Sequence, residues 1–115
     1  MLAALAACAP HLQEPRTYVV YFQPDSATLT NEAQKVVATI AAARADLNPS
    51  RITVEGRADG GTPHDATLAD QRARTVVRAL SVAGVDAAMM SILPSAPLSG
   101  VTGVAAHQVV VRFEP

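Results

Sequence analysis

The residues best placed to do chemistry are an acid and an arginine on either side of a short polar loop. Asp59 closes the segment Glu55-Gly56-Arg57-Ala58-Asp59, and Arg72 follows thirteen positions later. A carboxylate can bind an ammonium group, and a guanidinium can bind a carboxylate through two parallel hydrogen bonds that lysine cannot reproduce. The pair therefore suits a small ligand that carries both an amine and a carboxylate.

The loop between these two residues begins Gly60-Gly61-Thr62-Pro63-His64. Gly60 and Gly61 allow the backbone to approach a ligand closely, and the start of the next helix favours an anion. Asp65 works against that anion because it adds a negative charge. The predicted ligand-binding residues are Asp59, Gly60, Gly61, Asp65 and Arg72.

Each of these charged residues also has a purely structural interpretation. Asp59 before two glycines is ordinary turn chemistry. Arg72 sits at the edge of an apolar helix face, where its stem can cover the core while its head stays in water. Arg57 either pairs with Asp59 or Asp65 and blocks the site, or is a solvated side chain at an exposed edge.

Two amphipathic helices are expected to position these residues. Apolar residues at helical spacing predict helices over 31–46 and 67–82. The first is capped by Thr30 and the second by a Thr67/Asp70 capping box, with Gly84 just past its end. The predicted buried faces consist of Ala33, Val36, Val37, Ile40, Ala43 and Leu47, and of Ala69, Ala73, Val76, Val77 and Leu80.

Alternating or β-branched runs predict strands over 18–22, 51–55 and 108–113, and a short turn of helix and a strand fit between 85 and 92. The order β-α-β-α-(β)-β predicts an α+β fold, a two-layer sandwich in which both helices pack on one face of the sheet.

Composition limits the function further. At 115 residues with a net charge of −1 and four Phe or Tyr residues, the chain is a single domain with no basic run for nucleic acid. Eight of its nine cations are arginine, which suits carboxylate recognition. The histidines lack metal-ligand spacing and no catalytic motif is present, so we expect no metal, cofactor or enzymatic activity.

The residues around Asp59 and Arg72 resemble the OmpA-like peptidoglycan-binding domain over roughly residues 18–113. The family pattern, Gly-aromatic-Thr-Asp and then Asn-x-x-Leu-Ser-x-x-Arg-Ala, matches Gly56, Arg57, Ala58 and Asp59, then Asp65, Leu68, Ala69, Arg72 and Ala73. The resemblance implies a mixed sheet, and it implies that Asp59 and Arg72 hold diaminopimelate of the peptidoglycan stem peptide.

The chain departs from the family pattern around these two residues. Arg57 replaces an aromatic residue or His, Ala58 replaces Thr, Ala69 replaces Ser and Asp65 replaces Asn. The segment His107-Gln108-Val109-Val110 stands where the family has Arg-Arg-Val-Glu. Two functions therefore stay open, peptidoglycan binding and a degenerate module that serves protein interaction or structure in an envelope assembly.

The segment Leu5-Ala6-Ala7-Cys8 resembles a lipobox, in which Cys8 would carry lipid. The apolar run before it is short for a signal peptide and no basic residue precedes it, so an apolar tail is the alternative. The resemblance implies a lipoprotein signal and tether over 1–16, a domain over 17–115, and a periplasmic protein anchored to the outer membrane, with peptidoglycan and possible envelope proteins as partners.

Overall fold

A computed structural model of the chain describes residues 16–58, 62–94 and 106–115. Its elements, in chain order, are β1 (Arg16–Tyr21), α2 (Asn31–Leu47), β2 (Arg51–Gly56), α3 (Pro63–Val82), the short 3-10 helix η2 (Ala87–Met89), β3 (Met90–Leu93) and β4 (Gln108–Glu114). Cys8 lies outside the described residues, and the predicted domain boundary at residue 17 lies at their edge. The lipidation and the boundary both stay predictions.

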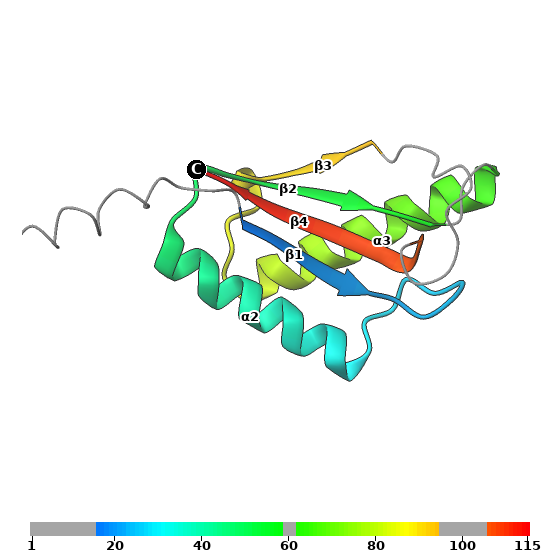
Figure 1. Ribbon diagram of the computed structural model, residues 1–115, viewed down its shortest axis with the longest axis horizontal. Helices are drawn as coiled ribbons and strands as arrows, with labels where there is room; N and C mark the ends of the chain where they lie inside the picture. Colours follow the sequence, from blue (N-terminus) through cyan, green and yellow to red (C-terminus); the bar gives the residue numbers. More distant parts are fainter. Residues whose placement is uncertain (1–15, 59–61, 95–105) are drawn as a thin grey trace, which may run out of the picture.

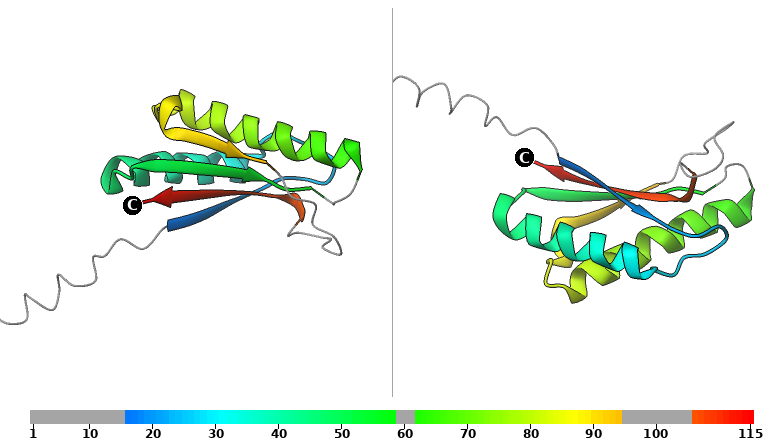
Figure 2. Two further views of the ribbon diagram at one scale, coloured as in Figure 1. Left: turned by 90° about the horizontal axis from the view of Figure 1, so that it is seen from above. Right: turned by 60° about the horizontal axis from the view of Figure 1, so that its bottom comes forward.

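The strands form one mixed sheet in the order β1-β4-β2-β3. The central strand β4 runs antiparallel to both β1 and β2, whereas β3 runs parallel to β2. Both helices cover the same face of this sheet (Figures 1 and 2). The predicted two-layer α+β architecture is confirmed, including the short strand after α3.

Helix α2 begins and ends where its sequence predicts. The Thr30 side chain accepts a hydrogen bond from the Ala33 amide at 3.0 Å, and Asn48 ends the helix in the left-handed conformation with φ 49°. Ile40 is fully buried, but the prediction that Leu47 belongs to the buried face is wrong, because 42% of it is exposed.

Helix α3 begins earlier than predicted. Thr62 is its N-cap, Pro63 opens the first turn, and Thr62 and Asp65 form a reciprocal capping box. The predicted Thr67/Asp70 box is therefore wrong, because those residues lie inside the helix. A proline is well suited to a first helical position, and here it combines with the earlier box to start the helix more than one turn sooner.

The C-terminal end of α3 confirms the role predicted for Gly84. Gly84 has φ +105°, its amide donates to Ser81, and the Val85 amide donates to Leu80. These two bonds satisfy carbonyls that the end of a helix otherwise leaves without partners.

Glycine at the end of β2 allows α3 to pack close to the sheet. A Cβ atom at Gly56 would overlap the carbonyl oxygen of Ala69. The core beneath is almost entirely aliphatic, and its fully buried members are Val20, Ile40, Ile52, Val54, Val76, Leu80, Val109 and Val111. The small residues Gly56, Ala69 and Ala73 therefore set how closely α3 packs against β2.

The helix-face assignment can be tested with two substitutions in α2. Ile40→Ala should lower the free energy of unfolding by about 2–5 kcal/mol, because it leaves a cavity in a closed core. Leu47→Ala, the matched control on the same predicted face, should cost less than about 1 kcal/mol because the residue is partly exposed. Urea unfolding measures both, and equal losses would contradict the assignment.

Candidate functional site

The candidate site lies at one end of the sheet, which we call the loop end. Strands β1, β2 and β3 finish there, and β4 and both helices begin there (Figure 1). Of the predicted ligand-binding residues, Asp59, Gly60 and Gly61 lie outside the described residues. Asp65 and Arg72 are described, and both lie on α3.

Arg72 is completely buried. Its Nε donates to the carbonyl of Ser26 at 2.7 Å and its Nη2 to that of Gln23 at 3.0 Å. Its Nη1 donates to the carbonyls of Arg57 at 2.9 Å and Ala106 at 3.3 Å. We call these four main-chain oxygens the carbonyl cage.

The carbonyl cage joins three segments that are distant in sequence. Gln23 and Ser26 belong to the connection between β1 and α2, Arg57 directly follows β2, and Ala106 precedes β4. A single guanidinium therefore holds together three of the described segments at the loop end. The interpretation in which the head of Arg72 stays in water is wrong.

Two further contacts support the cage. The Phe22 ring, itself buried, lies 5.6 Å from the Arg72 guanidinium carbon, within range for a cation–π interaction. One turn along α3, the Thr75 hydroxyl donates to the carbonyl of Ala27 at 2.9 Å. Sequence reasoning missed Thr75, although its position three residues after Arg72 places it on the same helix face.

The cage restricts how Arg72 can meet a ligand. Arginine has five N–H groups, and the four carbonyls take four of them. Arg72 also makes at least one further interaction. Because a two-pronged bond uses two N–H groups on one edge of the guanidinium, a ligand carboxylate would have to displace at least one carbonyl.

Asp65 has a local structural role. Its carboxylate accepts from the Thr62 hydroxyl at 2.7 Å and from the Thr62 amide at 3.3 Å, while its own amide donates to the Thr62 hydroxyl. An acid at this position is also stabilised by the helix dipole. The Asp65 carboxylate, which we expected near the ligand, is thus part of the α3 cap.

Arg57 departs from its solvated interpretation, whereas its predicted pairing with Asp59 lies outside the described residues and stays a prediction. Its side chain is only 25% exposed, so it is not simply solvated. Its guanidinium lies 3.7 Å from the Glu55 carboxylate and donates to the Gln108 side chain at 3.5 Å. Among the described residues its ionic partner is Glu55 rather than Asp65, because strand alternation puts residues 55 and 57 on the same face of the sheet.

The family model for the OmpA family matches residues 21–96. This span contains α2, β2, α3 and β3, and it includes Arg72. The chain belongs to the OmpA family. Comparison with the sequences of curated proteins gives no significant match.

Solved structures agree with this assignment. The OmpA-like domain of FopA1 from Francisella tularensis superposes with a TM-score of 0.74 at 23% identity, covering 88% of this chain and 73% of that one. The peptidoglycan-associated lipoprotein of Burkholderia pseudomallei gives a TM-score of 0.66 at 25% identity over 84% of this chain and 88% of that one. A periplasmic domain of Helicobacter pylori MotB gives 0.70 at 18% identity, with 90% and 76% covered.

An ion pair that the sequence did not predict lies on the rim of the loop end of this OmpA-like domain. His64 Nε2, in the first turn of α3, lies 3.0 Å from an Asp25 carboxylate oxygen, and both side chains are largely exposed. The hydrogen bond and charge of Asp25 raise the pKa of His64, and Asp65 adds to the effect. The pair links the β1–α2 connection to α3 outside the carbonyl cage.

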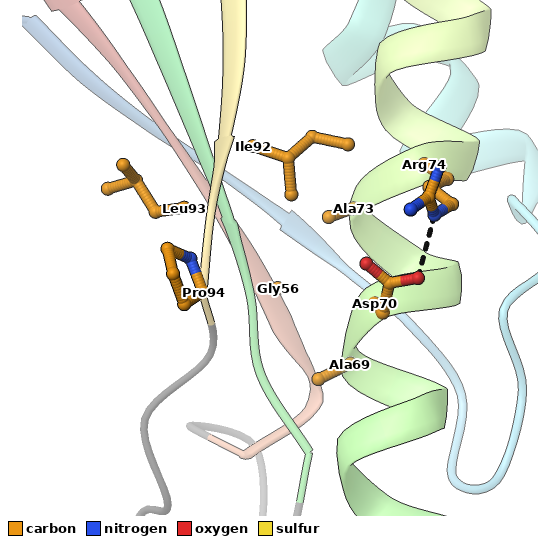
Figure 3. Close-up of a pocket in the computed structure, with 8 residues that line it drawn as sticks. All are labelled: Gly56, Ala69, Asp70, Ala73, Arg74, Ile92, Leu93 and Pro94. Carbon is orange, nitrogen blue, oxygen red and sulfur yellow. Dashed lines mark hydrogen bonds and ion pairs between the residues drawn. The ribbon is translucent and has the colours of Figure 1, made fainter.

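A cleft of about 210 Å³ lies beside the site, between α3 and the end of β3 (Figure 3). Its inner wall is made of small residues, and the Asp70–Arg74 ion pair lies on its helix side at 2.7 Å. Its lining residues are Gly56, Ala69, Asp70, Ala73, Arg74, Ile92, Leu93 and Pro94. Neither Arg72 nor Asp65 lines it, so the cleft is separate from the carbonyl cage.

Within residues 16–58, 62–94 and 106–115, no three His, Cys, Asp or Glu side chains gather closely enough to hold a metal ion. In the same part of the chain, no helix combines the length and apolarity needed to cross a bilayer.

The position of the α3 cap yields a direct test. Thr62→Ala should lower the free energy of unfolding by about 1 kcal/mol, because it removes the cap's hydrogen bonds. Thr67→Ala is the control, since Thr67 is an exposed residue inside the helix where alanine is the better helix former. If thermal unfolding showed the larger loss for Thr67→Ala, the helix would begin at the later site.

The His64–Asp25 pair predicts a small pH dependence. Because the folded-state pKa of His64 is raised above its ordinary value of 6.5, the contribution of the pair to stability is fully present below that pH. The contribution is lost as the pH rises through the folded-state pKa. An NMR titration should show that Asp25→Asn lowers the pKa of His64, and an unchanged value in this variant would contradict the pairing.

Proposed function

We propose that this OmpA-like domain binds peptidoglycan non-covalently, through a diaminopimelate-type residue of the stem peptide at the loop end. The observation that carries the proposal is the buried Arg72, which holds the carbonyl of Arg57, two residues before Asp59 in the sequence. The similarity to a peptidoglycan-associated lipoprotein over most of both chains supports the same ligand.

In this proposal the domain recognises the two opposite charges of the ligand. Asp59 accepts the ammonium group, and the loop backbone at Gly60 and Gly61 comes close to the ligand. Arg72 and the start of α3 supply positive charge for the carboxylate. The protein acts as a binding domain and not as an enzyme.

We also propose that the protein works in the periplasm and links the cell envelope to the cell wall. The similarity to the periplasmic domain of MotB supports this compartment. A lipid on Cys8, with residues 1–16 as signal and tether, would anchor the domain at residues 17–115 to the outer membrane. Envelope proteins are further proposed partners.

The second candidate function is a structural or protein-interaction module without the ligand. One observation favours it, namely that four of the five N–H groups of Arg72 already serve the main chain. Arg57 replaces an aromatic residue or His of the family pattern. Its guanidinium forms an ion pair with the Glu55 carboxylate.

Binding of a soluble diaminopimelate muropeptide, measured by calorimetry, distinguishes the two functions. Asp59→Ala should weaken binding by more than about 1.5 kcal/mol, because it removes a charge-assisted hydrogen-bond acceptor. Asp46→Ala removes an acid from the last turns of α2, at the opposite end of the domain, and should leave the affinity unchanged.

A wild-type domain that does not bind at millimolar muropeptide would overturn the peptidoglycan proposal and favour the structural module. Equal affinity of the wild type and Asp59→Ala would instead reject Asp59 as the ammonium acceptor. Circular dichroism of both variants should match the wild type, since neither residue belongs to the described core.

A further inference from the structure

We infer that Met89 is a modification site, at which oxidation of the thioether to a sulfoxide creates a strong hydrogen bond to Arg44. The two residues meet at the end of the domain opposite the loop end, where α2 and α3 finish and β3 begins (Figure 1). The inference concerns this end of the domain alone and does not depend on the proposed ligand.

The first observation is the edge that Arg44 presents to Met89. Arg44 lies in the last turn of α2, and its Nη2 donates to the Sδ atom of Met89 at 3.4 Å. Its Nε is shielded from solvent and has no hydrogen-bond partner among the described residues. Because the Nε–H and one Nη2–H point from the same edge of a guanidinium, an edge with two parallel donors meets a thioether sulfur, which is only a weak acceptor.

The second observation is that Met89 is held in place and is accessible. Its amide donates to the Asp86 carbonyl at 3.0 Å, and the Asp86 side chain caps η2 by accepting from the Ala88 amide at 2.9 Å. Met89 and Met90 are both partly exposed, but Met90 packs against the hydrophobic core. An oxidant in solvent can therefore reach the sulfur that lies beside Arg44.

The modification is a two-electron oxidation by a peroxide. A lone pair of the Met89 sulfur attacks one oxygen of hydrogen peroxide, so that an S–O bond forms while the O–O bond breaks. The other oxygen leaves as hydroxide, takes the proton from the new S–OH group and becomes water. The sulfur is oxidised and the peroxide is reduced. The product is methionine sulfoxide, whose oxygen is a strong hydrogen-bond acceptor.

Arg44 changes the usual consequence of this reaction. Methionine oxidation ordinarily disrupts apolar contacts, because it introduces a polar group among them. Here the sulfur already lies beside the donor edge of Arg44, and the unbranched Met89 side chain can rotate to direct the new oxygen toward Nε and Nη2. Oxidation should therefore strengthen the link between α2 and η2.

The reactivity test treats the full chain with hydrogen peroxide and locates the added oxygen by peptide mass spectrometry with fragmentation. Each protein carries Cys8→Ser, which removes a thiol that peroxide also oxidises. Met89 should be oxidised several-fold faster than Met90, because the Met90 side chain packs against the core. An equal or faster rate at Met90 would overturn the inference.

The stability test uses Met90→Leu, a volume-conserving change that leaves Met89 as the sole methionine of the described residues. Complete oxidation should leave the melting temperature of this variant unchanged or raise it. When Arg44→Leu is added, the two donors are lost, and oxidation should lower the melting temperature by about 4 °C or more. Adding Arg74→Leu instead is the matched control, because Arg74 is exposed on α3 and pairs with Asp70. An equal loss in all three proteins would overturn the inference.

An NMR measurement on Met90→Leu decides the question even if the protein with Arg44→Leu does not fold. On oxidation of Met89, the Nε–H signal of Arg44 should shift and its exchange with water should slow, because the group gains an acceptor. The Nε–H of Arg74, already bonded to Asp70 at 2.7 Å, should not change. If the Arg44 signal kept its position and exchange rate after complete oxidation, the inference would be wrong.

Discussion

The loop end of this domain depends on one buried cation. A guanidinium without solvent contact is costly unless hydrogen bonds replace its hydration. The chain meets that requirement with main-chain carbonyls from three separate segments, so the charge of Arg72 and the positions of those segments stabilise each other. Removing the guanidinium would leave the carbonyls without this partner, and moving the carbonyls would leave a buried charge without hydrogen bonds. The positions of the three segments are constrained for this reason.

The packing of α3 sets where that cation lies. Gly56 leaves space for the Ala69 carbonyl, and Ala73 is almost fully buried beside it. The helix can therefore lie close to β2, and the Arg72 side chain extends from it into the connections rather than into water. A larger residue at Gly56 would move the helix outward, and with it the guanidinium.

The site shows how a family motif can keep its residues and alter their surroundings. Arg72 is retained, but Asp65 serves the helix cap and Arg57 lies against Glu55. Hydrogen bonds within the site are thus directed largely toward the protein's own main chain. This arrangement is consistent with ligand contacts made by the ordered backbone, and it also explains why a module without ligand remains the competing function.

Local patterns in the sequence determined the element types, the α+β order, the Thr30 cap, the Gly84 helix end and the buried Ile40, because each depends on residues close together in the chain. Tertiary structure decided the rest. Leu47 keeps the apolar spacing but is partly exposed, and the four carbonyl partners of Arg72 among the described residues lie 15 to 49 residues away in sequence. Spacing along one helix cannot reveal main-chain oxygens that only the folded sheet and its connections bring together.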